Sequence, residues 1–322
     1  MAQNVLAAEQ HSDTWTSLLE RLNQQSVTKH FDAYADVAWD DERYRIDPDD
    51  PVWELPPDNP LSQTAWYRDL PAATRSRLGL HVIATQMKTG LQFESILKRG
   101  LLEFAAGLPN GTPEFRYAYH EVIEEAQHSL MFQEFVNRAG FDVAGLPPLI
   151  AIAARRVTRL GRVFPTLFFM FVLGGEDPID HVQRQTLRSG RDVHPLLERI
   201  MRIHVTEEAR HLSFARHYLK NNVPGLKRHH RVALSIQTPF ILGVMSQLML
   251  RPSPEIVKTY RIPKSVLSEA FTRNRTHRAA VSASVRKVRH LADDLGLVTP
   301  LSRQIWKVFG IWHDTTTSPT PT

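Results

Sequence analysis

The stretch Glu124-Glu125-Ala126-Gln127-His128 recurs almost unchanged as Glu207-Glu208-Ala209-Arg210-His211. Each copy contains Glu-x-x-His, and each lies in a long segment whose apolar residues have helical spacing. Because residues three and four apart are neighbours on a helix, the second Glu of each copy shares a face with its His. Two such faces, joined by one glutamate from each of two further helices, form the inward-facing site of di-iron and di-manganese carboxylate bundles.

The composition limits the kinds of site that this chain can hold. Its 322 residues are 42% hydrophobic and 23% charged, as in ordinary globular proteins, and include no cysteine. Thiolate zinc sites, iron–sulfur clusters and disulfides are therefore excluded. Any metal must be bound by His, Asp and Glu, which suits iron or manganese. The N-terminus lacks the layout of a signal peptide, so we expect a cytoplasmic protein.

The chain carries a formal charge of +5, and most of the basic excess follows Arg155. The motifs of common nucleic-acid-binding modules are missing, which favours a solvated basic face over a nucleic-acid partner. A basic entrance that attracts an anionic substrate is the alternative. The most apolar run, Val232 to Leu250, is interrupted by polar residues and a proline, and this predicts a buried helix rather than a membrane span.

Apolar periodicity, prolines and glycines predict four long helices at about 71–106, 113–140, 149–187 and 195–222. We expect the third to bend at Pro165. The sequence Gly174-Gly175-Glu176-Asp177-Pro178 predicts a kink or a widened turn at Glu176, because a proline inside a helix removes a backbone hydrogen bond.

The flanks of these four helices predict fewer features. A first helix is expected from Ser12 or Asp13 to about Leu22, followed by an irregular arm rich in proline and aspartate. Further helices are expected at about 226–250, 264–294 and 300–311, and a disordered tail at 314–322. The chain thus predicts one all-α domain over residues 1–313, with a ferritin-like four-helix bundle core at about 70–222, an irregular N-terminal arm and additional C-terminal helices.

Charged residues occupy core-facing positions on each of the four long helices. Glu94 precedes Glu125 by 31 residues and Glu176 precedes Glu208 by 32, the matching spans that a pseudo-twofold bundle requires. Four glutamates in one core would be costly without positive charge, and two divalent cations supply it. The predicted metal ligands are Glu94, Glu125, His128, Glu176, His204, Glu208 and His211, and no catalytic residue is predicted beyond them.

Several assignments stay open on sequence alone. A single Glu-x-x-His occurs often by chance, and a lone His on an apolar face is usually a core residue, but His204 lies four and seven residues before Glu208 and His211. Glu121 either orients a ligand histidine, which we favour, or is an extra ligand. Glu124 and Glu207 are expected to be surface charges, Glu207 in an ion pair with Arg210. Asp177 or Asp180 are alternatives to Glu176, and the remaining histidines are taken as structural or exposed.

Together these residues resemble the p-aminobenzoate N-oxygenase (AurF-like) family, ferritin-like di-iron oxygenases with a third histidine ligand. The resemblance rests on Glu94, Glu125-x-x-His128, Glu176 and His204-x-x-x-Glu208-x-x-His211, and it covers about residues 70–220. It implies two Fe ions, with Mn as an alternative, bridged by Glu125 and Glu208. Glu94 and His128 would complete one iron, and Glu176, His204 and His211 the other.

The resemblance also implies an activity. Family members activate O2 as a peroxo di-iron species and oxidise arylamines through hydroxylamines to nitro compounds. The expected partners are an aromatic amine, O2 and an external electron donor, since the sequence has no flavin or nicotinamide fingerprint. A homodimer is expected by analogy alone. The alternatives are a non-catalytic ferritin-like metal-binding protein, and a radical or fatty-acid-oxidising relative of the ribonucleotide reductase small subunit with Tyr117, Tyr119 or Tyr218 as the radical site.

Overall fold

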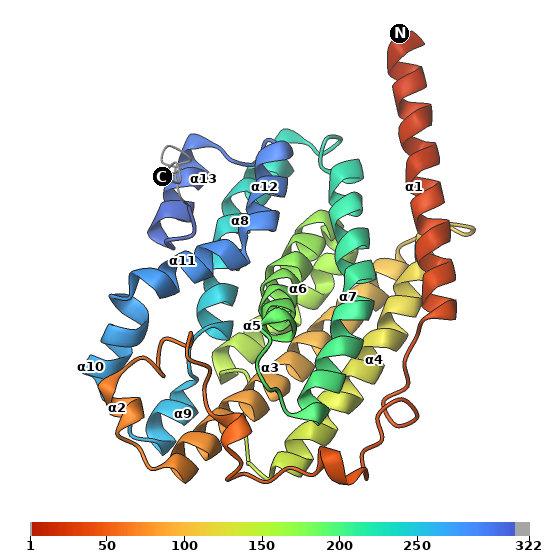
Figure 1. Ribbon diagram of the computed structural model, residues 1–322. Coiled ribbons are helices and arrows are strands. Elements are labelled where there is room, and N and C mark those ends of the chain that lie inside the picture. Colours follow the sequence, from red (N-terminus) through yellow and green to blue (C-terminus); the bar gives the residue numbers. More distant parts are fainter. Residues whose placement is uncertain (1, 313–322) are drawn as a thin grey trace, which may run out of the picture.

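The computed structural model describes residues 2–312, and this part of the chain is all-α, as predicted, without a β-strand (Figure 1). The long helices are α1 (Ala2–Thr28), α3 (Ala72–Ala106), α4 (Pro113–Ala139), α5 (Pro148–Val163), α6 (Pro165–Arg188), α7 (Pro195–Asn222) and α8 (Arg228–Met249). The shorter ones are α2 (Ala65–Arg68), α9 (Pro254–Thr259), α10 (Lys264–Leu267), α11 (Arg275–Ser284), α12 (Arg286–Asp294) and α13 (Pro300–Val308).

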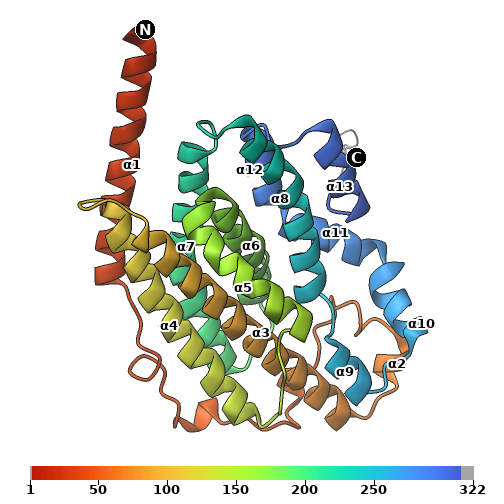
Figure 2. The ribbon, with the colours of Figure 1, turned by 180° about the vertical axis from the view of Figure 1, so that it is seen from behind.

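Helices α3, α4, α6 and α7 form the core bundle, and their bounds lie close to those expected (Figures 1 and 2). Local signals explain these limits. Pro113, Pro165 and Pro195 each stand in the first turn, where the missing N–H has no helical partner to lose. Gly140 ends α4 with a φ of 73°, the left-handed conformation that favours glycine. The consecutive pairs α3–α4 and α6–α7 pack as two hairpins.

The third predicted helix is divided in two at Phe164, directly before Pro165, which confirms the expected bend. The widened turn expected at Glu176 is absent, because α6 continues as an α-helix through Glu176 and Pro178. A kink at this position stays a prediction. The neighbouring glycines serve close packing instead. A Cβ on Gly175 would lie 1.9 Å from the ring of Phe93 on α3, so only glycine allows this approach.

The N-terminal region differs from the prediction at both ends of its helix. Helix α1 begins at Ala2 rather than at residue 12 or 13, and it continues past Leu22 to Thr28. Its first half projects beyond the rest of the protein (Figure 1). The following irregular arm, with short 3₁₀ turns at Glu42–Tyr44 and Pro51–Trp53, packs Ala33, Trp39 and Trp53 against the bundle.

The C-terminal helices cover one side of the bundle (Figure 2). The region expected at 264–294 is interrupted, since α10 leads into a π-helix at Ser268–Thr272 before α11 and α12. Within residues 2–312, one segment, Arg228–Thr259, could cross a membrane by length and composition alone. Leu234, Leu242 and Met245 of this segment lie in the main hydrophobic core, which supports the prediction of a buried helix. The tail at 314–322 lies outside the described residues.

Candidate metal centre

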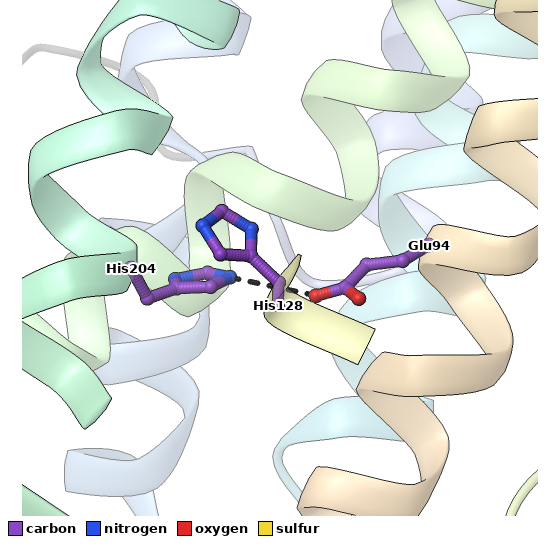
Figure 3. A group of neighbouring side chains, drawn as sticks. All are labelled: Glu94, His128 and His204. Atoms are coloured by element: carbon purple, nitrogen blue, oxygen red, sulfur yellow. Dashed lines mark ion pairs between the residues drawn. The ribbon is translucent and has the colours of Figure 1, made fainter. Parts of the chain in front are cut away.

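The structure brings all seven predicted ligand side chains together in the middle of the bundle, and none is more than 2% exposed. They come from α3, α4, α6 and α7, so each core helix contributes. Three groups have potential ligand atoms within 4.8 Å of one another: Glu94 with His128 and His204, Glu125 with His128 and Glu208, and Glu176 with His204 and Glu208. Figure 3 shows the first group, whose members point to a common centre.

Glu125 and Glu208 occupy the position between the histidines. Nδ1 of His211 lies 3.0 Å from Oε1 of each of these two glutamates. Nδ1 of His128 lies 3.7 Å from Glu125 Oε2 and from Glu208 Oε1. His204 Nε2 lies 3.8 Å from Glu208 Oε1. It also lies 3.8 Å from Glu94 Oε1, the ion pair drawn in Figure 3. His204 therefore faces Glu94 as well as Glu176, whereas the expectation placed it with Glu176 and His211 and assigned Glu94 to the other iron.

Each of the three histidines has its second ring nitrogen against an acceptor. These contacts are His128 Nε2 to Glu207 Oε2 (2.8 Å), His211 Nε2 to Glu124 Oε2 (2.7 Å) and His204 Nδ1 to Gln183 Oε1 (2.9 Å). A histidine that binds a metal donates its other N–H to a carboxylate or carbonyl, which fixes its tautomer and its orientation. The nitrogens that face the centre are then free to bind metal ions.

The prediction that Glu124 and Glu207 are surface charges is wrong. Both are buried, and each contacts the histidine of the other copy. Glu124 of α4 contacts His211 of α7, and Glu207 of α7 contacts His128 of α4. Arg210 is also buried, with Nη2 2.9 Å from Glu124 Oε1 and 3.5 Å from Glu207 Oε1. The repetition of the first Glu in both copies was the sequence signal for this role, whereas Gln183 has no comparable signal.

Glu121 does not make the orienting contact that the sequence favoured for it, because Glu124 makes that contact with His211. Glu121 is nevertheless buried one helical turn before Glu125, and it lies outside the three ligand groups. Burial raises the pKa of Glu121 to about 8. In the metal-free protein this side chain thus keeps its proton at neutral pH.

Among the acidic residues of α6, Glu176 is the one that belongs to the cluster. Asp177 pairs with Arg216, and Asp180 Oδ1 accepts a hydrogen bond from Arg184 Nε at 2.6 Å. Both aspartates are also close to Lys287, whose Nζ is 3.9 Å from Asp177 and 3.8 Å from Asp180. The two alternatives to Glu176 are therefore engaged with cations, Asp177 with Arg216 of α7 and Asp180 with Arg184 of the same helix.

The donor set fits a pair of divalent cations. Buried atoms without a hydrogen-bond partner include Glu94 Oε1, His128 Nδ1, Glu176 Oε1 and Glu208 Oε2. Burial and neighbouring carboxylates raise the pKa of Glu94 and of Glu176 well above the ordinary value. Unpaired buried carboxylates are costly, and metal ions would supply both the missing partners and the missing positive charge.

Comparison with known proteins extends the similarity along the chain. The family described as P-aminobenzoate N-oxygenase AurF matches residues 13–296, beyond the stretch covered by the motifs. "Uncharacterized protein Mb0909" of Mycobacterium bovis and "Uncharacterized protein Rv0885" of Mycobacterium tuberculosis are similar to this chain. Each is 38% identical over 294 residues, which cover 91% of this chain and 86% of the relative. No solved structure matches the chain at a significant level.

Proposed function

This chain belongs to the P-aminobenzoate N-oxygenase AurF family, and we propose that it is a non-haem di-iron oxygenase that oxidises the amino group of an aromatic amine. The observation that carries the proposal is the arrangement of the three histidines. Each has one ring nitrogen directed at buried glutamates and the other held by an acceptor on a neighbouring helix. A histidine cluster with only a packing role has no need of this arrangement.

The chain's contribution is to hold two iron ions in a fixed, largely anionic setting. In this proposal Glu94, Glu125, His128, Glu176, His204, Glu208 and His211 bind the metals. The bound iron pair supplies the redox chemistry with O2. Lys98 helps to fix one side of the centre, because its Nζ donates to the carbonyl oxygen of Glu125 (3.0 Å) and to Ser129, whose Oγ donates to Glu94 Oε2 (2.8 Å).

The surroundings of the centre suit an uncharged aromatic substrate. The ring centroid of Phe132 is 5.3 Å from that of His204 and 6.4 Å from that of His128. An aromatic ring thus lies directly beside two of the proposed ligands. Because the ligand side chains are buried, the substrate reaches them only when neighbouring side chains move. An external donor supplies the electrons in this proposal, and manganese is the alternative to iron.

The proposal is tested with iron-loaded protein that is reduced anaerobically and then mixed with O2 and a panel of small arylamines. We expect hydroxylamine and nitro products, identified by mass. Metal-free protein and a His204→Ala variant are the controls, and both should be inactive. If the reduced, iron-loaded protein consumes no O2 with any arylamine, the protein is instead a metal-binding protein without turnover.

A radical-generating oxidase is the second candidate, and one observation favours it. Tyr117 is fully buried on α4, one turn before Glu121, and its hydroxyl has no hydrogen-bond partner. Tyr119 is 43% exposed and Tyr218 is partly exposed, so they are poorer candidates. A tyrosyl radical signal in electron paramagnetic resonance that disappears in Tyr117→Phe would favour this function over N-oxygenation.

A further inference from the structure

The chain directly after α1 makes contact with the candidate metal centre through Glu207. From here on, the arm means only the first part of the irregular N-terminal segment, residues 29–36, which descends from α1 beside α4 in Figure 1. The backbone N–H of Phe31 donates to Glu207 Oε1 at 3.1 Å. The other oxygen of the same carboxylate lies 2.8 Å from His128 Nε2. One carboxylate therefore joins the arm to a proposed metal ligand.

The two repeated stretches, 124–128 and 207–211, also bind the arm, each through its fourth residue. Gln127 Oε1 accepts from the backbone N–H of Ala33 (2.9 Å), and Gln127 Nε2 donates to Asp32 Oδ2 (3.2 Å). In the second copy, Arg210 Nη2 donates to the carbonyl oxygen of Lys29 (3.0 Å). The residues adjacent to both ligand histidines thus bind the arm directly.

The arm has a defined conformation of its own. Asp32 Oδ1 accepts from the backbone N–H groups of Tyr34 (2.9 Å) and Ala35 (2.8 Å), which fixes a tight turn. Arg199 of α7 donates twice to the carbonyl oxygen of Asp36, at 3.0 and 2.8 Å. Its guanidinium also lies over the ring of Phe31. The position of the Phe31 N–H is therefore set by several independent contacts.

The carboxylate that holds His128 and the carboxylate that holds His211 differ in their contacts with the arm. Glu207 receives the backbone N–H of Phe31 on the oxygen that does not contact His128. The corresponding oxygen of Glu124 has no such donor from the arm and faces Arg210 at 2.9 Å. The arm consequently contacts the partner of His128 directly, whereas it reaches the partner of His211 only through Arg210, which binds Lys29 of the arm and also lies 3.5 Å from Glu207 Oε1.

We propose that the arm is an outer clamp of the metal centre and that Phe31, through its backbone N–H, positions Glu207 and thereby His128 for metal binding. This inference rests on the proposed function, because it assumes that His128 is a ligand. Metal affinity falls about 10–100-fold when the partner that orients a ligand histidine is lost. Since the coupling between two binding events is reciprocal, metal binding must in turn hold the arm more tightly.

The first experiment compares hydrogen exchange in the segment 29–36 for metal-free and Mn(II)-loaded protein. We expect exchange at the Phe31 amide to slow by about 10-fold on metal binding. Because the coupling is reciprocal, this factor equals the loss of metal affinity expected when the Phe31 N–H is removed. Equal exchange in the two forms would overturn the inference. Exchange in the remote helix α13 serves as the internal reference for general stabilisation by metal, and it should slow less than exchange at the Phe31 amide.

The second experiment compares Phe31→Pro with Phe31→Ala by the rate at which a chelator removes Mn(II). Both variants lose the aromatic ring, but only proline loses the N–H. We expect one of the two metal ions to leave about 10-fold faster from Phe31→Pro than from Phe31→Ala. Equal release rates would show that the N–H has no positioning role. Metal-free unfolding of both variants checks that they differ little in general stability.

A second pair of variants covers the case in which Phe31→Pro does not fold. Gln127→Met removes both arm contacts of Gln127, whereas Gln133→Met removes another hydrogen bond of α4, the one from Lys88 to Gln133 at 2.8 Å. Only Gln127→Met should speed metal release. If the wild-type protein binds fewer than about one metal ion per chain, the proposed function fails; if it binds two and neither pair differs, only the clamp is refuted.

Discussion

Replacing Glu176 by methionine should make the metal-free protein more stable while weakening its response to metal. Glu176 is buried, its Oε1 has no hydrogen-bond partner, and burial together with neighbouring carboxylates, Glu208 foremost, raises its pKa well above the ordinary value. Without metal ions this side chain is a cost to folding. Replacing a buried ion pair by packed apolar side chains of similar size is often neutral or stabilising by about 1–4 kcal/mol. We expect a gain of at most this size for Glu176→Met, because an unpaired buried carboxyl is replaced by an apolar side chain.

With metal ions bound, wild type should be more stable than Glu176→Met. A ligand present at about 100 times its Kd stabilises the folded state by about 2.7 kcal/mol. Wild type should gain at least this much per site, and Glu176→Met should gain less because it lacks one ligand. The matched control is Asp180→Asn on the same helix. Asp180 is equally buried but pairs with Arg184 at 2.6 Å, so its loss should cost about 1–3 kcal/mol with and without metal.

The assay is urea unfolding followed by circular dichroism, on metal-stripped protein and on protein loaded with Mn(II). The reasoning is refuted if metal-free Glu176→Met is less stable than wild type, since burial of this unpaired carboxyl group would then not be a cost to folding. It is also refuted if the variant and wild type gain equally from Mn(II).

Three further predictions concern the centre, the packing beside it and the C-terminal helices. Glu124→Gln should raise the Kd for metal about 10–100-fold through the weakened contact with His211, measured by chelator competition; an unchanged Kd would exclude this contact from metal binding. Gly175→Ala should lower the free energy of unfolding by about 1–3 kcal/mol, measured with urea, because its Cβ would overlap the ring of Phe93. Phe93→Leu in the same chain should recover part of this loss, and if the effects of the two substitutions simply add, the contact between the two residues is contradicted. Burial lowers the pKa of His277 to about 4, so the unfolded chain binds this proton first as the pH falls. Stability should therefore decrease by up to about 1.4 kcal/mol per pH unit between pH 6.5 and 4, and an unchanged slope in His277→Phe would contradict this.

The sequence predicted the bundle well because its signals are local. Helical spacing, Pro113 and Pro195 at helix starts and Gly140 at a helix end all act within a few residues. The two Glu-x-x-His segments likewise required only helix geometry. The same local rules predicted a widened turn at Glu176 from Pro178, but α6 accommodates this proline within a continuous α-helix. The close contacts of Gly174 and Gly175 depend on side chains of other helices, which local rules do not contain.

The partners that hold the histidines could not be predicted, since they depend on contacts between distant segments. Glu124 and Glu207 lie to one side of the apolar stripes, which normally indicates solvent. The arm and the opposing helix cover this side, and the Phe31–Glu207 contact joins residues 176 positions apart. Gln183 reaches His204 between α6 and α7 in a similar way. Such contacts follow from the packing of elements rather than from any pattern within one of them.

The measurement that tests the central claim most directly is the metal content of the purified, metal-loaded protein, determined by elemental analysis. The account predicts about two iron or manganese ions per chain, and a lower number when a proposed ligand such as Glu176 is replaced. Fewer than about one ion per chain after loading, under conditions where the protein remains folded, would contradict the metal centre and the function built on it.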